Sequence, residues 1–135
     1  MIVVDTNVWS VQVSRRPDAR VVDWLIEHDP QLWLSTIVIG EIRYGAELPK
    51  AQAIRPMLSG WLRGLEQTYA ARILPFDAAA ANLFGELRGR RPEQSKLLDL
   101  QLAAQALAHD ATIATRNLRD FAWTGVRLID PWGGV

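Results

Sequence analysis

The first chemically suggestive feature of this sequence is a carboxylate placed directly after an apolar stretch near the N-terminus. The chain begins MIVVDTNVWS, in which residues 2–4 have the composition of a buried strand and Asp5 follows at once. Thr6 and Asn7 come next, and both side chains can hydrogen-bond a neighbouring carboxylate. Taken alone, Asp5 is equally well explained as a strand end or helix cap. A catalytic interpretation therefore depends on other acids that reach the same place.

Two further acids interrupt the apolar faces of predicted helices. In STIVIGEIRYGAEL, Glu41 shares a helical row with positions 37, 44, 45 and 48, because residues three and four apart stack on one face. In KLLDLQLAAQALAH, Asp99 shares its row with positions 102, 103, 106 and 107, and Gln101 and Gln105 are expected on a different, polar side. Burying an unpaired carboxylate is costly, so each acid requires an arginine, backbone donors or a cation.

The stretch TRNLRD adds Asn117 and Asp120 after a predicted strand. Each polar residue has an ordinary structural explanation: Asn117 and Asp120 as turn residues, Asp99 as a helix-dipole partner, Glu41 in an arginine pair. Together they indicate a carboxylate cluster. Like charges held close together repel unless a divalent cation neutralises them. Such a cluster can hold Mg²⁺, activate water and hydrolyse a phosphodiester.

These side chains require a framework that brings them to one edge. The patterns predict strands at 2–4, 32–35, 72–76, 111–115 and 126–130. They predict helices starting at Asp18, from an N-cap at Thr36 to Glu47, over about 51–70, after Asp77 and over 97–108, with RGRRPEQS as a loop. Alternating strands and helices predict one α/β domain over residues 1–135, with a central parallel sheet flanked by helices on both faces. Sites in such sheets form beyond the carboxyl ends of the strands, where both Asp5 and TRNLRD lie.

Composition narrows the chemistry. The sequence has no cysteine and two histidines, so a divalent metal would be held by carboxylate oxygens, which suits Mg²⁺ or Mn²⁺. No apolar run approaches the roughly 20 residues that span a bilayer, and no signal peptide is evident. We therefore expect a cytoplasmic protein without a membrane segment. Net charge is zero, but 13 of the 15 basic residues are arginine, which suits phosphate contacts.

The motifs DTNVWS, IGEIRYG, DLQLAAQALAHDATIATRNLRDF and GVRLIDPW follow one another over essentially the whole chain. In types, order and spacing they resemble PIN-domain ribonucleases of the VapC and FitB toxin type. The resemblance implies a compact PIN-like α/β fold with an acidic pocket for Mg²⁺ or Mn²⁺. It also implies metal-dependent endonucleolytic cleavage of RNA, a toxin role in a type II toxin–antitoxin module, neutralisation by a small DNA-binding antitoxin, and a homodimer.

Matched position by position, the resemblance assigns roles to the acids. Asp5 and Asp99 correspond to direct metal ligands, and Glu41 corresponds to an acid that binds metal or orients its water. The fourth acidic role goes to Asp120 with Asn117 in support. Some relatives carry an acid at the Asn117 position instead, so the sequence leaves open which of the two fills the role.

The resemblance also suggests supporting residues. Thr6 and Asn7 are expected to orient Asp5 through hydrogen bonds. The loop before Asp99 departs from the family pattern, which often has a glycine and a more apolar entry, and RRPEQSKLL instead places basic residues upstream of a catalytic acid. Trp9 either packs in the core or at a partner interface, or stacks on a base. The candidate RNA-binding residues are Arg88, Arg90, Arg91, Lys96 and Arg116.

Two other functions compete with the toxin nuclease. The chain could be a PIN-like RNA- or protein-binding module that has lost activity, since a fold does not fix a function. It could instead be an aspartyl phosphotransferase with Asp5 as nucleophile. That chemistry favours a second acid at Asn7 and a well-placed lysine, whereas Asn7 is an amide and the only lysines are Lys50 and Lys96.

Overall fold

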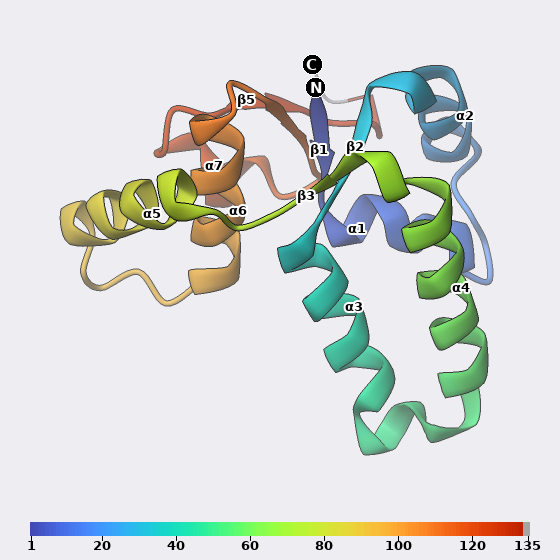
Figure 1. The fold of residues 1–135 in the computed structure, drawn as a ribbon. Coiled ribbons are helices and arrows are strands. Elements are labelled where there is room, and N and C mark those ends of the chain that lie inside the picture. The colour runs from blue at the N-terminus through green and yellow to red at the C-terminus, as the bar shows by residue number, and fades with distance from the viewer. Residues whose placement is uncertain (134–135) are drawn as a thin grey trace.

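The computed structural model describes residues 1–133 and places a five-stranded parallel sheet between two layers of helices (Figure 1). The strands lie in the order β3-β2-β1-β4-β5. They are β1 (Ile2–Val4), β2 (Leu32–Ser35), β3 (Ile73–Leu74), β4 (Thr112–Ala114) and β5 (Arg127–Ile129). The helices are α1 (Thr6–Trp9), α2 (Ala19–His28), α3 (Thr36–Glu47), α4 (Arg55–Thr68), α5 (Ala78–Arg90), α6 (Leu97–Ala108) and α7 (Leu118–Ala122). The predicted fold class is confirmed.

Strand β1 occupies the centre of the sheet. It pairs in parallel with β2 on one side and with β4 on the other, with Val4 opposite Ala114. Val3 and Val4 are completely buried, as expected for a strand covered by helices on both faces. From β1 the sheet continues through β2 to β3, and from β4 it continues in the opposite direction to β5. The boundary between β1 and β4 is therefore a topological switch point, and in open sheets of this kind a crevice lies beyond the carboxyl ends of the strands there. That crevice is where the candidate acids converge.

The core lies on both sides of β1. Figure 1 shows α1, α2 and α4 on one side of the sheet and α5 and α6 on the other. Trp9 is fully buried, and its ring lies 5.1 Å from that of Tyr69 in a tilted aromatic pair. Core packing is therefore confirmed for Trp9, and stacking on a base is wrong. On the other face, α6 contributes Leu102, Ala103 and Ala106 to the same core.

Helix starts follow the capping chemistry of the sequence. Asp18 and Asp77 cap α2 and α5 as predicted, because their carboxylates accept hydrogen bonds from backbone N–H groups of the first turn. The predicted cap at Thr36 is wrong by one residue: Ser35 Oγ accepts from the N–H of Ile37 at 3.0 Å. The helix predicted over 51–70 begins only at Arg55, because a 3₁₀ segment occupies Pro49–Ile54.

Three other predictions need correction. The loop expected at 88–95 is wrong at its start: α5 continues through Arg90, so Arg88 and Arg90 lie in the last turn of this helix and the loop begins at Arg91. The strand expected over 72–76 is reduced to two residues by Pro75, which has no N–H for the ladder. Gln105 is completely buried: it accepts from Ser35 Oγ and donates to the carbonyl of Leu74 at 3.2 Å. No helix within residues 1–133 is long and apolar enough to cross a membrane.

Candidate active site

Asp5 stands at the carboxyl end of β1, where its side chain also caps α1. It is buried, with 5% of its surface exposed. Oδ1 accepts from the N–H of Thr6 at 2.8 Å, and Oδ2 accepts from Thr115 Oγ1 at 2.8 Å and Asn7 Nδ2 at 3.3 Å. Burial raises the pKa of Asp5 above its ordinary value, with a further increase from Glu41, although the hydrogen bonds oppose it. The cap explanation is thus correct, but the carboxylate also faces the other acids.

Thr115 is a site residue that sequence reasoning missed. It directly follows β4, is completely buried, and lies beside Asp5 because the register pairs Val4 with Ala114. Its hydroxyl donates to Asp5 and accepts from the N–H of Asn117 at 3.0 Å. The parallel pairing of the two strands would have pointed to this contact, since both residues follow an apolar strand.

Asn7 joins the same two strand ends. Its Nδ2 donates to Asp5 and, at 3.4 Å, to Thr115, and its Oδ1 accepts from the N–H of Arg116 at 3.2 Å. The contact of Asn117 with this network is its backbone N–H to Thr115, and its own side chain does not cap α7. The network therefore fixes the Asp5 carboxylate and the start of the TRNLRD segment relative to each other.

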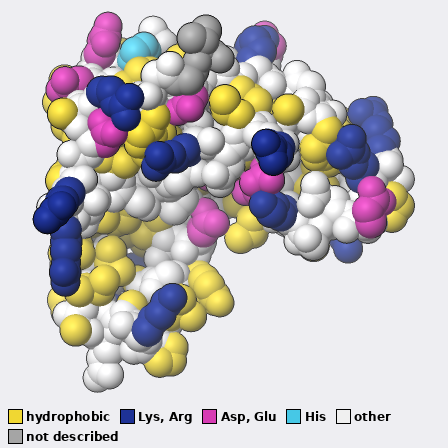
Figure 2. Space-filling model, turned by 180° about the vertical axis from the view of Figure 1, so that it is seen from behind, with side chains coloured by type: hydrophobic (Ala, Val, Ile, Leu, Met, Phe, Trp, Pro, Cys, Tyr) yellow, Lys and Arg dark blue, Asp and Glu magenta, His cyan; other side chains and the backbone are white. Residues whose placement is uncertain are grey.

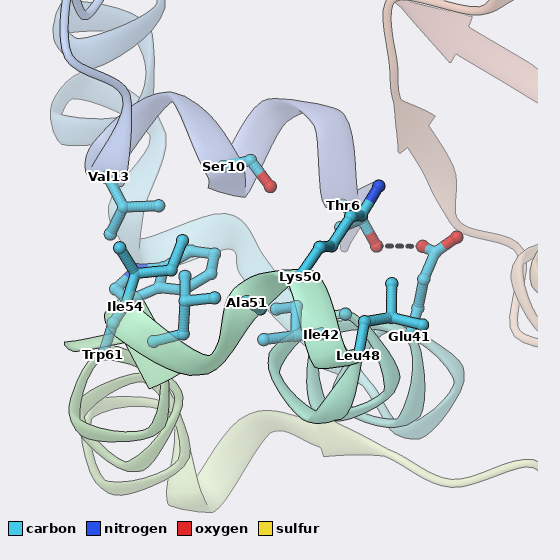
Figure 3. Close-up of a pocket in the computed structure, with 12 residues that line it drawn as sticks. Thr6, Ser10, Val13, Glu41, Ile42, Leu48, Lys50, Ala51, Ile54 and Trp61 are labelled. Carbon is cyan, nitrogen blue, oxygen red and sulfur yellow. Dashed lines mark hydrogen bonds between the residues drawn. The ribbon is translucent and has the colours of Figure 1, made fainter. Parts of the chain in front are cut away.

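Glu41 approaches from α3, the helix that leaves β2. Its Oε1 accepts a hydrogen bond from Thr6 Oγ1, the contact drawn in Figure 3. Thr6 therefore touches Asp5 through its backbone and Glu41 through its hydroxyl. This single residue connects the carboxylates of two elements that are far apart in the sequence.

Asp99 lies in the first turn of α6 and is partly buried. Burial, followed by the negative charges of Asp5, Asp120 and Glu41, raises its pKa to about 6, and the charge of Lys96 opposes this increase. The four acids that the sequence singled out are therefore close enough to influence one another electrostatically. Their functional roles stay predictions.

Asp120 differs from the other acids because it has a cationic partner. Lys96 Nζ donates to Asp120 Oδ2 at 2.9 Å. Lys96, Asp99 and Asp120 line one narrow recess, together with Gln94 and Trp123. Lys96 thus lies within the acidic site itself rather than merely upstream of it.

The candidate RNA-binding arginines are all exposed to solvent, and two of them lie over tryptophan rings. Arg88 and Arg90 are exposed at the end of α5. The guanidinium of Arg91 lies 4.6 Å from the ring centroid of Trp123, and that of Arg116 lies 4.8 Å from the ring centroid of Trp132. Figure 2 shows acidic side chains in the hollow between the α3–α4 hairpin and the α5 end of the molecule, with Lys and Arg side chains beside them.

A second hollow adjoins the acids on the side of α3. It is an apolar pocket of about 500 Å³ between α1 with its following turn and the α3–α4 hairpin (Figure 3). Thr6 and Glu41 stand at one end, and Lys50 extends over it. Its apolar lining includes Val13, Ile42, Leu48, Ala51, Ile54, Leu58 and Trp61. This pocket leads directly to the acidic site.

The donor set suits a hard divalent cation. The candidate ligands Asp5, Glu41 and Asp99, and Asp120 beside them, are all carboxylates, the oxygen donors that Mg²⁺ and Mn²⁺ prefer. Their mutual repulsion at Asp99 is of the kind a bound cation relieves. Within residues 1–133 no three acids or histidines are grouped closely enough to form a complete ligand set. Binding would therefore require side-chain movement, most directly at Asp120, which Lys96 now holds.

The fold and the site together define a class of protein: an open parallel α/β domain with a group of carboxylates at the switch point between β1 and β4. The PIN domain family model matches residues 2–125, and the chain belongs to this family. Within it, the chain is similar to the toxins of the VapC and FitB type. It is 34% identical over 137 residues to VapC ribonuclease Y4jK of Sinorhizobium fredii (98% of each chain covered) and 33% identical over 142 residues to toxin FitB of Neisseria gonorrhoeae (98% of this chain, 99% of FitB).

Solved structures agree. The crystal structure of FitAcB from Neisseria gonorrhoeae matches with a TM-score of 0.88 at 32% identity, covering 99% of this chain and 100% of that one. The structure of FitAB bound to the IR36 DNA fragment matches with a TM-score of 0.82 at 31% identity, covering 100% of this chain and 98% of that one. The predicted family and fold are confirmed.

Proposed function

We propose that the chain is the toxin of a type II toxin–antitoxin module and a metal-dependent endoribonuclease that hydrolyses RNA phosphodiesters with Mg²⁺ or Mn²⁺. One observation carries the chemistry: the four carboxylates, from the end of β1 and from α3, α6 and α7, lie close enough to act on one another. Burial, together with the charges of the other three acids, raises the pKa of Asp99 to about 6. Relatives over nearly the full length are named ribonucleases, and one is a tRNA(fMet)-specific endonuclease.

The proposed roles follow from the contacts. Asp5 and Asp99 would hold the cation, with Glu41 beside them, and Asp120 would complete the site with Asn117 in support. When bound, the divalent cation neutralises the carboxylates, lowers the pKa of water and offsets charge that develops on the phosphate.

The other residues orient these acids. Thr6 and Asn7 hold the Asp5 carboxylate, and Thr115 fixes it from the neighbouring strand. Thr6 engages one oxygen of Glu41, which leaves the other able to accept a proton from the attacking water. Asp5 already accepts three hydrogen bonds, an arrangement that suits a fixed ligand better than a covalent nucleophile.

The proposed partners are RNA, an antitoxin and a second copy of the chain. A toxin–antitoxin complex from Klebsiella pneumoniae is among the solved structures that match, with 26% identity and a TM-score of 0.65. The apolar pocket beside Glu41 is evidence for the antitoxin as a partner, because an apolar segment of that protein could bind in it and reach the acidic site. Tyr44 and Leu98 are 68% and 48% exposed and line one hollow with Glu41, which supports a dimer surface. Light scattering should show a dimer for the wild type and a monomer for Tyr44→Asp, and an unchanged mass for this variant would remove that surface from the interface.

The activity is tested by comparing the wild type with Asp99→Asn on a pool of structured and single-stranded RNAs. Each is incubated with Mg²⁺, with Mn²⁺ and with EDTA, and Asp23→Asn, which changes an exposed acid on α2, is the matched control. We expect the wild type and Asp23→Asn to cleave RNA when Mg²⁺ or Mn²⁺ is present and not in EDTA. Equal cleavage by Asp99→Asn would assign the activity to another site or a contaminant. Mn²⁺ binding without any cleavage would instead favour a binding module.

A further inference from the structure

We propose that Lys96 is a built-in cation of the acidic site, which pairs with Asp120 in the metal-free protein and must release this carboxylate when a divalent ion binds. The inference deepens the proposed function and rests on it. It gives Lys96 a positioning role within the site, in addition to any contact with RNA.

The geometry places the ammonium group at the acids. Lys96 Nζ lies 2.9 Å from Asp120 Oδ2, and both side chains line the recess that also contains Asp99. Asp120 is the more enclosed partner, with 27% of its side chain exposed against 56% for Lys96. The lysine can therefore swing away into solvent, whereas the carboxylate stays in the recess.

The charge of Lys96 reaches beyond its direct partner. Lys96 stands three residues before Asp99 and lines the same recess, so its positive charge also acts on that carboxylate. A single positive charge neutralises part of the negative charge that a divalent cation would neutralise in this cluster. Because Lys96 pairs with one carboxylate only, the other three stay without a paired cation. Lys96 and a metal ion therefore compete for the same negative charge.

The backbone of Lys96 is anchored even though its side chain is exposed. Its N–H donates to Gln94 Oε1 at 3.0 Å, and its carbonyl accepts from the N–H of Leu100 in the first turn of α6. Earlier in the same loop, Arg91 stacks over Trp123 of the segment that follows α7. The loop is thus fixed to both helices that carry Asp99 and Asp120, which keeps the base of the Lys96 side chain beside the two acids.

The test measures Mn²⁺ affinity by electron paramagnetic resonance without RNA. Lys96→Met keeps the length of the stem but removes the charge, and we expect it to tighten binding roughly three- to tenfold, the range for one partly screened charge at a divalent site. Lys96→Arg should bind like the wild type. Arg63→Met, which removes an exposed charge on α4, controls for net charge and should also match the wild type. Equal or weaker binding by Lys96→Met would overturn the inference.

A second pair of variants tests whether the lysine acts through its partner. In an Asp120→Asn background the carboxylate that Lys96 holds is gone, so adding Lys96→Met should tighten Mn²⁺ binding clearly less than it does in the wild-type background. An undiminished effect would overturn the pairing. If wild type and Lys96→Met both fail to bind Mn²⁺, the proposed metal-dependent function fails, and the inference falls with it. Binding by both with equal affinity refutes the role of Lys96 alone.

Discussion

Asp99→Asn should stabilise the metal-free protein, even though it removes a residue placed at the centre of the site. In the folded chain, burial and the neighbouring acids raise the pKa of Asp99 to about 6, against an ordinary value of 3.8. The folded state therefore binds this proton more tightly than the unfolded state does. Consequently the free energy of unfolding falls as the pH rises from about 3.8 to about 6, and it stays lower at higher pH.

The magnitude follows from the same two values. One pKa unit corresponds to about 1.4 kcal/mol, so a difference of about 2 units sets an upper limit of about 3 kcal/mol. Asp99 is only partly buried, and solvent and the other acids screen and share the repulsion. We therefore expect the asparagine variant to gain about 1–2 kcal/mol at neutral pH, which corresponds to a rise in melting temperature of roughly 3–8 °C for a chain of this size.

Urea unfolding in EDTA measures this gain at about pH 7.5 and about pH 4. The gain of Asp99→Asn should be present at the higher pH and nearly absent at the lower one, where the folded wild type is already protonated. Asp23→Asn on the outside of α2 should show neither effect. Added Mn²⁺ should stabilise the wild type and not Asp99→Asn. A gain of the same size at both pH values, or a loss at pH 7.5, would refute the electrostatic argument.

Three further predictions concern the surroundings of the acids. Thr115→Val removes a hydroxyl that donates to the buried Asp5 carboxylate, so it should cost about 1–3 kcal/mol in urea unfolding and weaken Mn²⁺ binding in a calorimetric titration. Replacing Arg90 and Arg91 together by Ala should weaken RNA binding and reduce the slope of its logarithm against log salt by up to about 1.4, and an unchanged slope would remove them from the binding surface. Gln105→Leu leaves two buried polar groups without their partner, so thermal unfolding should show a loss of about 1–3 kcal/mol.

Much of the framework could be predicted from local patterns. The buried run before Asp5 and the caps at Asp18 and Asp77 depend on nearest neighbours, so their positions were correct. The helix over 97–108 was also correct, because its apolar periodicity continues for three turns. Element ends were less accurate where proline intervenes, as at Pro75, because a missing donor shortens a strand only when a partner strand is in place.

The parts that could not be predicted depend on contacts between distant segments. Thr115 supports Asp5 across more than a hundred residues, and only the pairing of β1 with β4, which its own neighbourhood does not reveal, distinguishes it from any strand-end threonine. Gln105 was placed on a polar side because one helix does not show which surfaces will cover it. Lys96 was interpreted only as an upstream phosphate contact, since its reach to Asp120 depends on how α6 and α7 pack.

The central position of β1 determines when this protein becomes complete during synthesis. β1 is translated first, but one of its two neighbours, β4, comes more than a hundred residues later, and the N–H of Asp5 bonds the carbonyl of Ala114 at 2.9 Å. A ribosome-bound chain that stops before β4 therefore lacks the second neighbour of β1. The helices that carry Asp99 and Asp120 are then not yet in place beside Asp5. Interrupted translation products should be harmless to the cell, and a partner that needs the finished pocket can be engaged only after nearly the whole chain has emerged.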